Sequence, residues 1–436
     1  MKLVVRTTDP GFRRLEKRLV RRGEALESTV ERSVRRIVSD VRARGDKAVA
    51  EATERFDRVR VPPAKLVIER KEMRAACVDL PRADLAALKT AARRIKAFHA
   101  KQRETSFRYR DRSGVTLGQE IRPLGRVGLY VPGGTAFYPS SVLMNGLPAV
   151  VAGVGEIVAV TPPHEGGEPA TLLAAAYLAG VDRIYRVGGA QAIAALAYGT
   201  KRIPRVDKIV GPGNAYVATA KRLVAGWVGI DMVAGPSEVV VVADASADPE
   251  LVAADLLAQA EHGEDSTAIC LTPSSRLATA VEAAVLEQLD ELPRGEVART
   301  AMRDFGAIIV TRGLSEAVEL ANELAPEHLE LAVKSPRRLI ERIDHAGAIF
   351  VGHSSPEAFG DYLAGPNHVL PTGGSARFAS PLGVYDFVKR TSVIEATPRA
   401  LASLSRPLLR LAEMEGLEAH GAAVSRRVAK RSRRGR

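Results

Sequence analysis

Short apolar runs alternate with alanine-rich helical segments through the middle of the chain, and this alternation restricts the fold more than any other feature. The strand-like runs include "GRVGLYV", "EIVAVTP", "RIYRVGG", "EVVVVAD" and "AIIVT", and between them lie segments such as "PATLLAAAYLAGV" and "PELVAADLLAQAEHG". Strands and helices that alternate in this way are typical of βαβ units around a parallel sheet. The stretch "VAGPSE" (233–238) divides the pattern in two. The sequence therefore predicts an α/β fold with two parallel-sheet domains.

Helical accessory segments flank the two predicted sheets. Residues 25–57 have apolar positions at helical spacing, broken at "RGD", and a second helical stretch covers 82–102. A chain of 436 residues is long for a single core, which favours several compact regions. The predicted regions are a mostly helical N-terminal region at 1–124, a first sheet domain at 125–236, a second sheet domain at 237–380, and a small helical C-terminal segment with a basic tail at 381–436.

The net charge of +12 is concentrated near the C-terminus. Seven basic residues and no acid lie within 426–436, which leaves five positive charges for the remaining residues. Aromatic residues make up only 5% of the chain, and no basic stripe is interleaved with them, so nucleic acid is not the partner we expect. We predict a solvated, frayed tail. A nucleic-acid or membrane-surface role for the tail and an oligomer contact are the alternatives.

Cysteine usage and hydropathy indicate the compartment. Cys77 and Cys270 lie far apart and form no CxxC pattern, which argues against a disulfide framework and against a thiolate zinc site. The N-terminal "MKLVVRTTDPGFRR" has too few consecutive apolar residues for a signal peptide. No apolar run approaches the ~18 residues that a membrane span needs. We expect a cytoplasmic protein with no membrane contact.

Three glycine-containing turns follow strands of the first predicted sheet: "YVPGGTAFYPSS", "VGGAQAIAA" and "VGPGNAYVA". In open parallel sheets, ligands lie beyond the carboxyl ends of the strands, where helix N-termini present free N–H groups. None of the three turns is a GxGxxG, so plain turns are one interpretation and a dinucleotide crevice is the other. Tyr130, Gln191 and Asn214 are the polar residues that we expect to face such a crevice.

The stretch "LLAQAEHGEDS" ends a predicted helix whose N-cap is Asp248 and whose C-cap is Gly263. Three residues along a helix correspond to about 60° around its axis, so Gln259 and His262 can reach one point. Glu261 points elsewhere on the same geometry. The alternative is a capped helix end with a satisfied histidine.

Two further stretches contain acid–base or ligand side chains. In "APEHLEL", Glu327 and His328 stand at a strand start, where histidine suits proton removal from an alcohol and glutamate suits activation of water. A charged strand edge is the alternative. Asp361, in a glycine-rich turn, and His420, in the last helical piece, extend the amide–imidazole pair to an N/O ligand set that suits Zn²⁺ or Mn²⁺. Spacing leaves open whether the four converge.

With these motifs the chain resembles the histidinol dehydrogenase family. The matching stretches include "YVPGGTAFYPSSVLMNGLPA", "VDKIVGPGNAYVATAKR", "GIDMVAGPSEV", "LLAQAEHG", "LAPEHLEL", "GDYLAGPNHVLPTGG" and "EGLEAHG", and together they cover nearly everything from about 40 to 425. Blocks of this length are far more specific than a lone glycine pattern.

The resemblance implies an NAD-dependent, zinc-containing enzyme that oxidises L-histidinol to L-histidine through the aldehyde and consumes two NAD⁺. The regions 125–236 and 237–380 would be Rossmann-like domains, the first binding NAD and the second holding the metal and acid/base residues. The family is homodimeric, and its C-terminal segment reaches the partner's site. By position, the resemblance implies Glu327 and His328 as acid/base residues; Tyr130, Gln191 and Asn214 as NAD-binding; Gln259, His262, Asp361 and His420 as zinc ligands; and Ser237, Gln259, His262, His328, Asp361, Glu415 and His420 as substrate-binding.

The implied chemistry gives the two acid/base residues separate steps. His328 would take the hydroxyl proton as hydride leaves for the nicotinamide, and Glu327 would then activate the water that attacks the aldehyde. The substrate's imidazole and amine are good zinc ligands, so the metal would orient it. A zinc hydrolase that uses Glu327 as general base is the alternative, and in that enzyme Tyr130, Gln191 and Asn214 would have no role.

Four features near or beyond these motifs receive no role in the reaction. Glu261 is predicted not to bind metal, and His368 is expected at most to support a neighbouring ligand. Gly383 stands where the family pattern would have serine, and the arginine-rich end beyond Arg426 looks like an addition.

Overall fold

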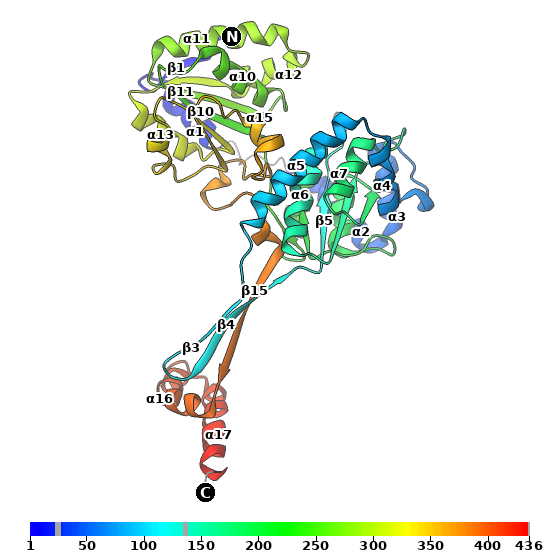
Figure 1. Cartoon of the computed structure of the whole chain (residues 1–436), viewed down its shortest axis with the longest axis vertical. Coiled ribbons are helices and arrows are strands. Elements are labelled where there is room, and N and C mark those ends of the chain that lie inside the picture. Colours follow the sequence, from blue (N-terminus) through cyan, green and yellow to red (C-terminus); the bar gives the residue numbers. More distant parts are fainter. Residues whose placement is uncertain (22–27, 134–137, 435–436) are drawn as a thin grey trace. The chain divides into compact units, whose positions relative to one another are not determined.

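The computed structural model describes residues 1–21, 28–133 and 138–434. The chain divides into two compact units (Figure 1). Unit 1 comprises Met1–Gln102 and Leu124–Phe387, and unit 2 comprises Arg103–Pro123 and Val388–Arg436. Within the described ranges, no helix is long and apolar enough to cross a membrane.

The first sheet of unit 1 has six strands in the order β2-β7-β6-β5-β8-β9. Its strands are β2 (Val67–Glu69), β5 (Arg126–Tyr130), β6 (Glu156–Thr161), β7 (Arg183–Arg186), β8 (Lys208–Val210) and β9 (Gly229–Ile230). All neighbours are parallel except β2, which runs antiparallel to β7. The chain moves outward from β5 through β6 to β7 and then continues on the other side of β5 with β8. Between β5 and β8 there is therefore a topological switch point, the place where open α/β sheets bind ligands.

Helices cover both faces of this sheet. On one face lie α2 (Ser28–Arg44), α3 (Asp46–Asp57), α8 (Gly189–Tyr198) and α9 (Ala215–Val224), and on the other lie α4 (Arg70–Asp79), α5 (Arg82–Ala100), α6 (Pro139–Ala152) and α7 (Ala170–Leu178). Strand side chains alternate between faces, so Val158 packs in the first core and Ile157 in the second. The predicted break between α2 and α3 is confirmed at Gly45, whose φ of +57° suits glycine.

The second sheet of unit 1 is entirely parallel, in the order β1-β12-β11-β10-β13-β14. Its strands are β1 (Val4–Arg6), β10 (Glu238–Ala243), β11 (Thr267–Thr272), β12 (Ala307–Val310), β13 (His328–Ala332) and β14 (Ala348–Val351). The helices α10 (Pro249–Ala260), α11 (Ser275–Glu291) and α12 (Gly295–Phe305) pack on one face, and α1 (Phe12–Val20) and α13 (Leu314–Leu324) pack on the other. Two parallel sheets with helices on both faces confirm the predicted fold class.

Unit 2 consists of a three-stranded antiparallel sheet and two helices. The elements are β3 (Phe107–Arg110), β4 (Val115–Pro123), β15 (Val388–Ala396), α16 (Pro398–Met414) and α17 (Glu418–Arg434). The sheet has the order β15-β4-β3, and α16 packs against α17. Figure 1 shows β4 and β15 running side by side along their length.

The structure divides the chain differently from the four predicted regions. The segment 1–124 is not a region of its own, because β1 completes the second sheet, β2 completes the first, and residues 103–123 belong to unit 2. The segment from 381 is not only helical, since β15 pairs with β4 over nine residue pairs. These strands were missed because β1, β2 and β15 pair with partners more than a hundred residues away, and a local pattern does not reveal such pairs. The basic tail was predicted to be frayed, whereas in the structure helix α17 continues to Arg434.

Candidate active site

The three predicted glycine turns lie at the carboxyl edge of the first sheet, because β5, β7 and β8 are mutually parallel in it. Part of the turn after β5, residues 134–137, lies outside the described residues. Gly211 follows β8 with φ +115°, and a Cβ at this position would lie 2.2 Å from the carbonyl oxygen of Tyr130. Only glycine allows this approach, so the turn after β8 lies against the end of β5 at the switch point.

The three polar residues predicted to face a dinucleotide lie at this edge in different settings. Tyr130 is buried at the end of β5, and its hydroxyl accepts a hydrogen bond from the backbone N–H of Gly189, at the start of α8 (3.1 Å). Gln191 is buried in the first turn of α8. Asn214 is the exposed N-cap of α9, and its Oδ1 accepts hydrogen bonds from two N–H groups of the first turn.

A buried ion pair holds the turn after β8. The ammonium of Lys221 and the carboxylate of Asp231 are each 1% exposed and in contact with each other. Lys221 donates to the carbonyl oxygen of Gly211 (2.9 Å), and Asp231 accepts from the N–H of the same residue (2.7 Å). Both backbone groups of Gly211 are therefore fixed by one pair of charges.

In the second sheet, a cluster of acids and histidines lies at the amino edge. Glu238 begins β10, and Glu327 and His328 lie at the start of its parallel neighbour β13. Glu327 Oε2 accepts a hydrogen bond from the N–H of Glu238 (3.0 Å), and the Nδ1–H of His328 donates to the Glu238 carbonyl oxygen (2.9 Å). A carbonyl can only accept, so the neutral imidazole keeps its lone pair on Nε2. That Nε2 is buried and has no hydrogen-bond partner among the described residues.

Burial sets the protonation of the two residues predicted to act as acid and base, Glu327 and His328. It lowers the pKa of His328 to about 4, against an opposing effect of the nearby Asp361 carboxylate. Burial, with repulsion from Glu238, raises the pKa of Glu327 well above its usual range. Near neutral pH the imidazole of His328 is therefore uncharged, and the neighbouring carboxyl group of Glu327 releases its proton less readily than an ordinary glutamate does.

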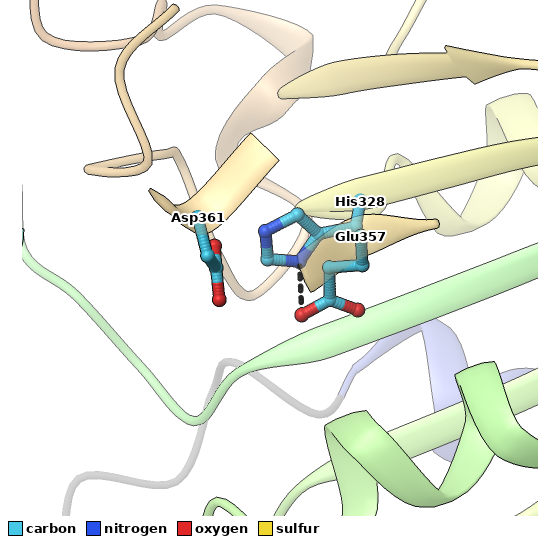
Figure 2. A group of neighbouring side chains, drawn as sticks. All are labelled: His328, Glu357 and Asp361. Carbon is cyan, nitrogen blue, oxygen red and sulfur yellow. Dashed lines mark ion pairs between the residues drawn. The ribbon is translucent and has the colours of Figure 1, made fainter. Parts of the chain in front are cut away.

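Glu357 belongs to this cluster and was not predicted from the sequence. It is buried at the start of α15 (Glu357–Phe359), and its Oε1 lies 3.6 Å from His328 Nδ1. One ligand atom from each of His328, Glu357 and Asp361 lies within 4.8 Å of the others. Figure 2 shows the imidazole of His328 between the carboxylates of Asp361 and Glu357. Proline followed by glutamate is common at helix starts, so no signal in "SSPEAFGD" distinguished this residue.

Gln259 and His262 lie at the C-terminal end of α10. The Gln259 amide nitrogen, in the orientation that satisfies its neighbours, lies 3.0 Å from Glu357 Oε1. The predicted C-cap at Gly263 is wrong, because α10 ends at Ala260 with Glu261 as C-cap. The exposed His262 therefore lies outside the helix.

His262 is nevertheless held next to the cluster. Its Nδ1–H donates to the carbonyl oxygen of Ala258 (3.0 Å), which leaves its Nε2 lone pair free of that bond. Burial is the main cause of the lowered pKa values of His328 and His368, and the charge of the nearby His262 adds to both.

Asp361 lies in a short π-helix (Gly360–Ala364) and is supported by His368. The Nδ1–H of His368 donates to the Asp361 carbonyl oxygen (3.1 Å) and lies 3.8 Å from its Oδ1. The other ring nitrogen of His368 contacts the Ser141 hydroxyl of α6 (3.4 Å). His368 thus ties the Asp361 segment to the first sheet's helices.

The structure brings together some of the predicted site residues and leaves others in separate parts of the chain. Gln259, Glu327, His328 and Asp361 meet with Glu357 at one edge of the second sheet. Ser237, partly buried, directly precedes β10 at the same edge. Glu415 and His420 lie in unit 2, the first as C-cap of α16 and the second in α17.

The family model for histidinol dehydrogenase matches residues 20–428. The chain belongs to the histidinol dehydrogenase family. It is similar to the histidinol dehydrogenase of Syntrophotalea carbinolica, with 55% identity over 410 residues, 94% of this chain and 95% of that one. It is also similar to the enzyme of Bacillus cereus, with 54% identity over 399 residues and 92% of each chain. The crystal structure of histidinol dehydrogenase from Elizabethkingia anophelis superposes with a TM-score of 0.92, at 36% identity, over 99% of this chain and 98% of that one.

Membership in the histidinol dehydrogenase family confirms the resemblance predicted from the sequence and makes the chain an oxidoreductase. The donor chemistry at the amino edge of the second sheet suits a divalent cation. Among the described residues the buried Nε2 of His328 has no hydrogen-bond partner, and one carboxylate oxygen from each of Glu357 and Asp361 lies within 4.8 Å of a ring nitrogen of His328. The C-terminal end of α10 also points its negative dipole end at Gln259 and His262, which favours positive charge there.

The buried ion pair at Gly211 generates a stability prediction. Lys221→Met should lower the free energy of unfolding by about 3 kcal/mol, because it leaves the Asp231 charge buried without its cation. Urea unfolding followed by circular dichroism measures this change. The exposed Lys201 supplies the matched control, and Lys201→Met should change stability by no more than about 0.5 kcal/mol. Equal effects of the two variants would contradict the role given to the pair.

Proposed function

We propose that this chain oxidises L-histidinol to L-histidine through L-histidinaldehyde and uses two NAD⁺ and a zinc ion. Family membership supports the substrate and the reaction. The observation that carries the proposal is the lock on His328, whose Nδ1–H is bonded to the Glu238 carbonyl so that a buried Nε2 is free to accept a proton.

His328 is proposed to act as base in both oxidations. Its fixed tautomer directs the Nε2 lone pair away from the protein hydrogen bond, and its low pKa keeps the ring uncharged before substrate binds. Nε2 removes the hydroxyl proton of the alcohol in the first oxidation and that of the aldehyde hydrate in the second. A general base of this kind contributes typically about 10²–10⁴-fold to the rate.

Glu327 is proposed to activate the water that attacks the aldehyde. Its Oε2 is held by the Glu238 N–H, so the carboxyl group has one orientation at the edge of the sheet. Burial gives its carboxylate an unusually high affinity for a proton, which suits removal of a proton from water.

The cofactor and the metal ion have separate places in this proposal. NAD⁺ would supply the hydride acceptor for both oxidations, and we assign Tyr130, Gln191 and Asn214 to hold it at the switch point of the first sheet. Zn²⁺ would supply a Lewis acid that orients the imidazole and amine of the substrate. We assign the ion to Gln259, His262 and Asp361, completed by His420.

The proposal includes a homodimer and a cytoplasmic location. The C-terminal segment would supply Glu415 and His420 to the partner's site, and Ser237 would contact the substrate from the loop before β10. The family resemblance supports the dimer, and the position of Ser237 directly before β10 supports its contact with the substrate.

The central test is the amount of NADH formed per L-histidinol consumed by the purified protein, with and without a chelator. We expect a ratio near two that the chelator abolishes and Zn²⁺ restores. A ratio near one would mean that the aldehyde escapes before the second oxidation. No NADH formation, with chelator-sensitive hydrolysis of an ester or amide, would favour the hydrolase alternative.

Glu327→Gln should slow the oxidation of L-histidinaldehyde by about 10²-fold or more and slow the alcohol step much less. The amide can still accept the Glu238 N–H but cannot take a proton from water. Single-turnover rates from each substrate separate the two halves. Glu319→Gln, an exposed change in the preceding helix, serves as the control. An equal loss in both halves would contradict the division of roles between Glu327 and His328.

Metal content distinguishes the assigned ligands from the His328, Glu357 and Asp361 group. His262→Asn should lose most of its zinc and its activity, while Glu261→Gln keeps both. Glu357→Gln should keep its zinc, because Glu357 is already hydrogen-bonded to Gln259. Zinc per chain after dialysis, measured by plasma mass spectrometry, gives the answer. Zinc lost in Glu357→Gln but kept in His262→Asn would reverse the assignment.

A further inference from the structure

The first sheet has an acid at its ligand edge that the proposed function does not use. Asp57 is the last residue of α3, and its Oδ2 lies 3.5 Å from the amide nitrogen of Gln191, which donates to it. Its charge also reaches Tyr130, whose pKa is raised to about 12 by burial, with Asp57 adding to the increase. Asp57 is thus adjacent to two of the three residues assigned to NAD.

The position of Asp57 is unfavourable for a carboxylate without a ligand. It stands at the C-terminal end of a helix, where the dipole opposes negative charge. It is partly buried, and within the described parts of the chain it forms no salt bridge. Burial raises its pKa to about 6. The backbone is also unusual here, because Arg58 is one of two described non-glycine residues with positive φ (+57°). Such strain persists where surrounding structure or function maintains it.

A ligand with two neighbouring hydroxyl groups would supply hydrogen-bond donors to the Asp57 carboxylate. An ionised carboxylate only accepts hydrogen bonds, and its two oxygens match the two donors of a vicinal diol. In dinucleotide-binding sheets an acid at the end of the second strand serves this purpose for the adenosine ribose. Here that strand, β6, is followed directly by Pro162 and Pro163.

The position of Asp57 relative to the switch point also supports a contact with the adenosine ribose. Asp57 lies beside Gln191 in α8, the helix that follows β7, in the half of the sheet formed by β5, β6 and β7. That half corresponds to the mononucleotide-binding half whose acid contacts the adenosine ribose. Arg186, the basic residue that ends β7, is already paired with the buried Glu168 and so is not available for a 2′-phosphate.

We propose that Asp57 binds the 2′- and 3′-hydroxyls of the adenosine ribose and selects NAD⁺ against its 2′-phosphorylated form. A 2′-phosphate would replace a donor by a second negative charge next to this carboxylate. The inference rests on the proposed use of NAD⁺ at this edge, and it adds a specificity residue that comes from the N-terminal helices.

The test compares steady-state constants for NAD⁺ and NADP⁺ in the wild-type protein, in Asp57→Asn and in Glu54→Gln. Glu54 is an exposed acid on the same helix and controls for charge. In Asp57→Asn we expect KM for NAD⁺ to rise about 10- to 100-fold, as for loss of hydrogen bonds to a charged group. We also expect the ratio of kcat/KM for NAD⁺ over NADP⁺ to fall by at least as much. KM for L-histidinol should stay within about threefold, and Glu54→Gln should match the wild type.

A second measurement requires no variant and so does not depend on how Asp57→Asn folds. The NAD⁺ analogue that lacks the adenosine 2′-hydroxyl should show a KM about tenfold higher than NAD⁺ with wild-type protein. An unchanged preference between NAD⁺ and NADP⁺ in Asp57→Asn, or equal use of the deoxy analogue, overturns the role of Asp57 while NAD⁺ reduction by the wild type stands. No reduction of either cofactor by the wild type overturns the proposed function and this inference together.

Discussion

The cluster of acids and histidines at the amino edge of the second sheet depends on a pair of hydrogen bonds between two neighbouring strand starts. The N–H and C=O of Glu238 hold Glu327 and His328, so the register of β10 and β13 orients both of these side chains. Parallel pairing makes this possible, because it places both strand starts at one edge. A slip of one residue would turn the side chains of β13 to the opposite face and remove both groups from the site.

The same edge concentrates buried acids to an unusual degree. Besides Glu327, Glu357 is buried, and burial with repulsion from Asp361 raises its pKa well above its usual range. Behind it, burial and the neighbouring Asp255 raise the pKa of Glu330 to about 9, and Glu330 accepts a hydrogen bond from the Glu357 N–H (2.8 Å). So many carboxyl groups can remain buried together only with bound protons or with a cation between them. This electrostatic demand makes the edge suitable for a metal and for a substrate with a cationic amine.

Local sequence signals predicted much of the fold and named four of the residues that meet at the amino edge of the second sheet, namely Gln259, Glu327, His328 and Asp361. Asp248 caps α10 as expected, and strand–helix alternation predicted two parallel sheets. Long-range pairing was not predictable, so the pairing of β15 with β4 in unit 2 was missed. The glycine turns were recognisable, but their contact at the switch point depends on strand order. Glu357 was not predicted as a site residue because a glutamate after a proline is ordinary at a helix start. Only its proximity to His328 in the folded chain identifies it as part of the cluster.

The pairing of β1 with β12 has a consequence for how the chain folds. Val4 pairs with Ile308, and the N–H groups of Leu3 and Val4 donate to Glu282. The second sheet therefore cannot complete its edge until a segment some three hundred residues later has emerged from the ribosome. The sheet of unit 2 is completed later still, because β4 cannot pair with β15 until residues 388–396 have been synthesised. Both delays leave strand edges open during synthesis, when intermolecular pairing is most dangerous. The earliest translated strand, β1, is thus where intermolecular pairing can most easily disturb the assembly of this protein, although it lies far in sequence from Glu327 and His328.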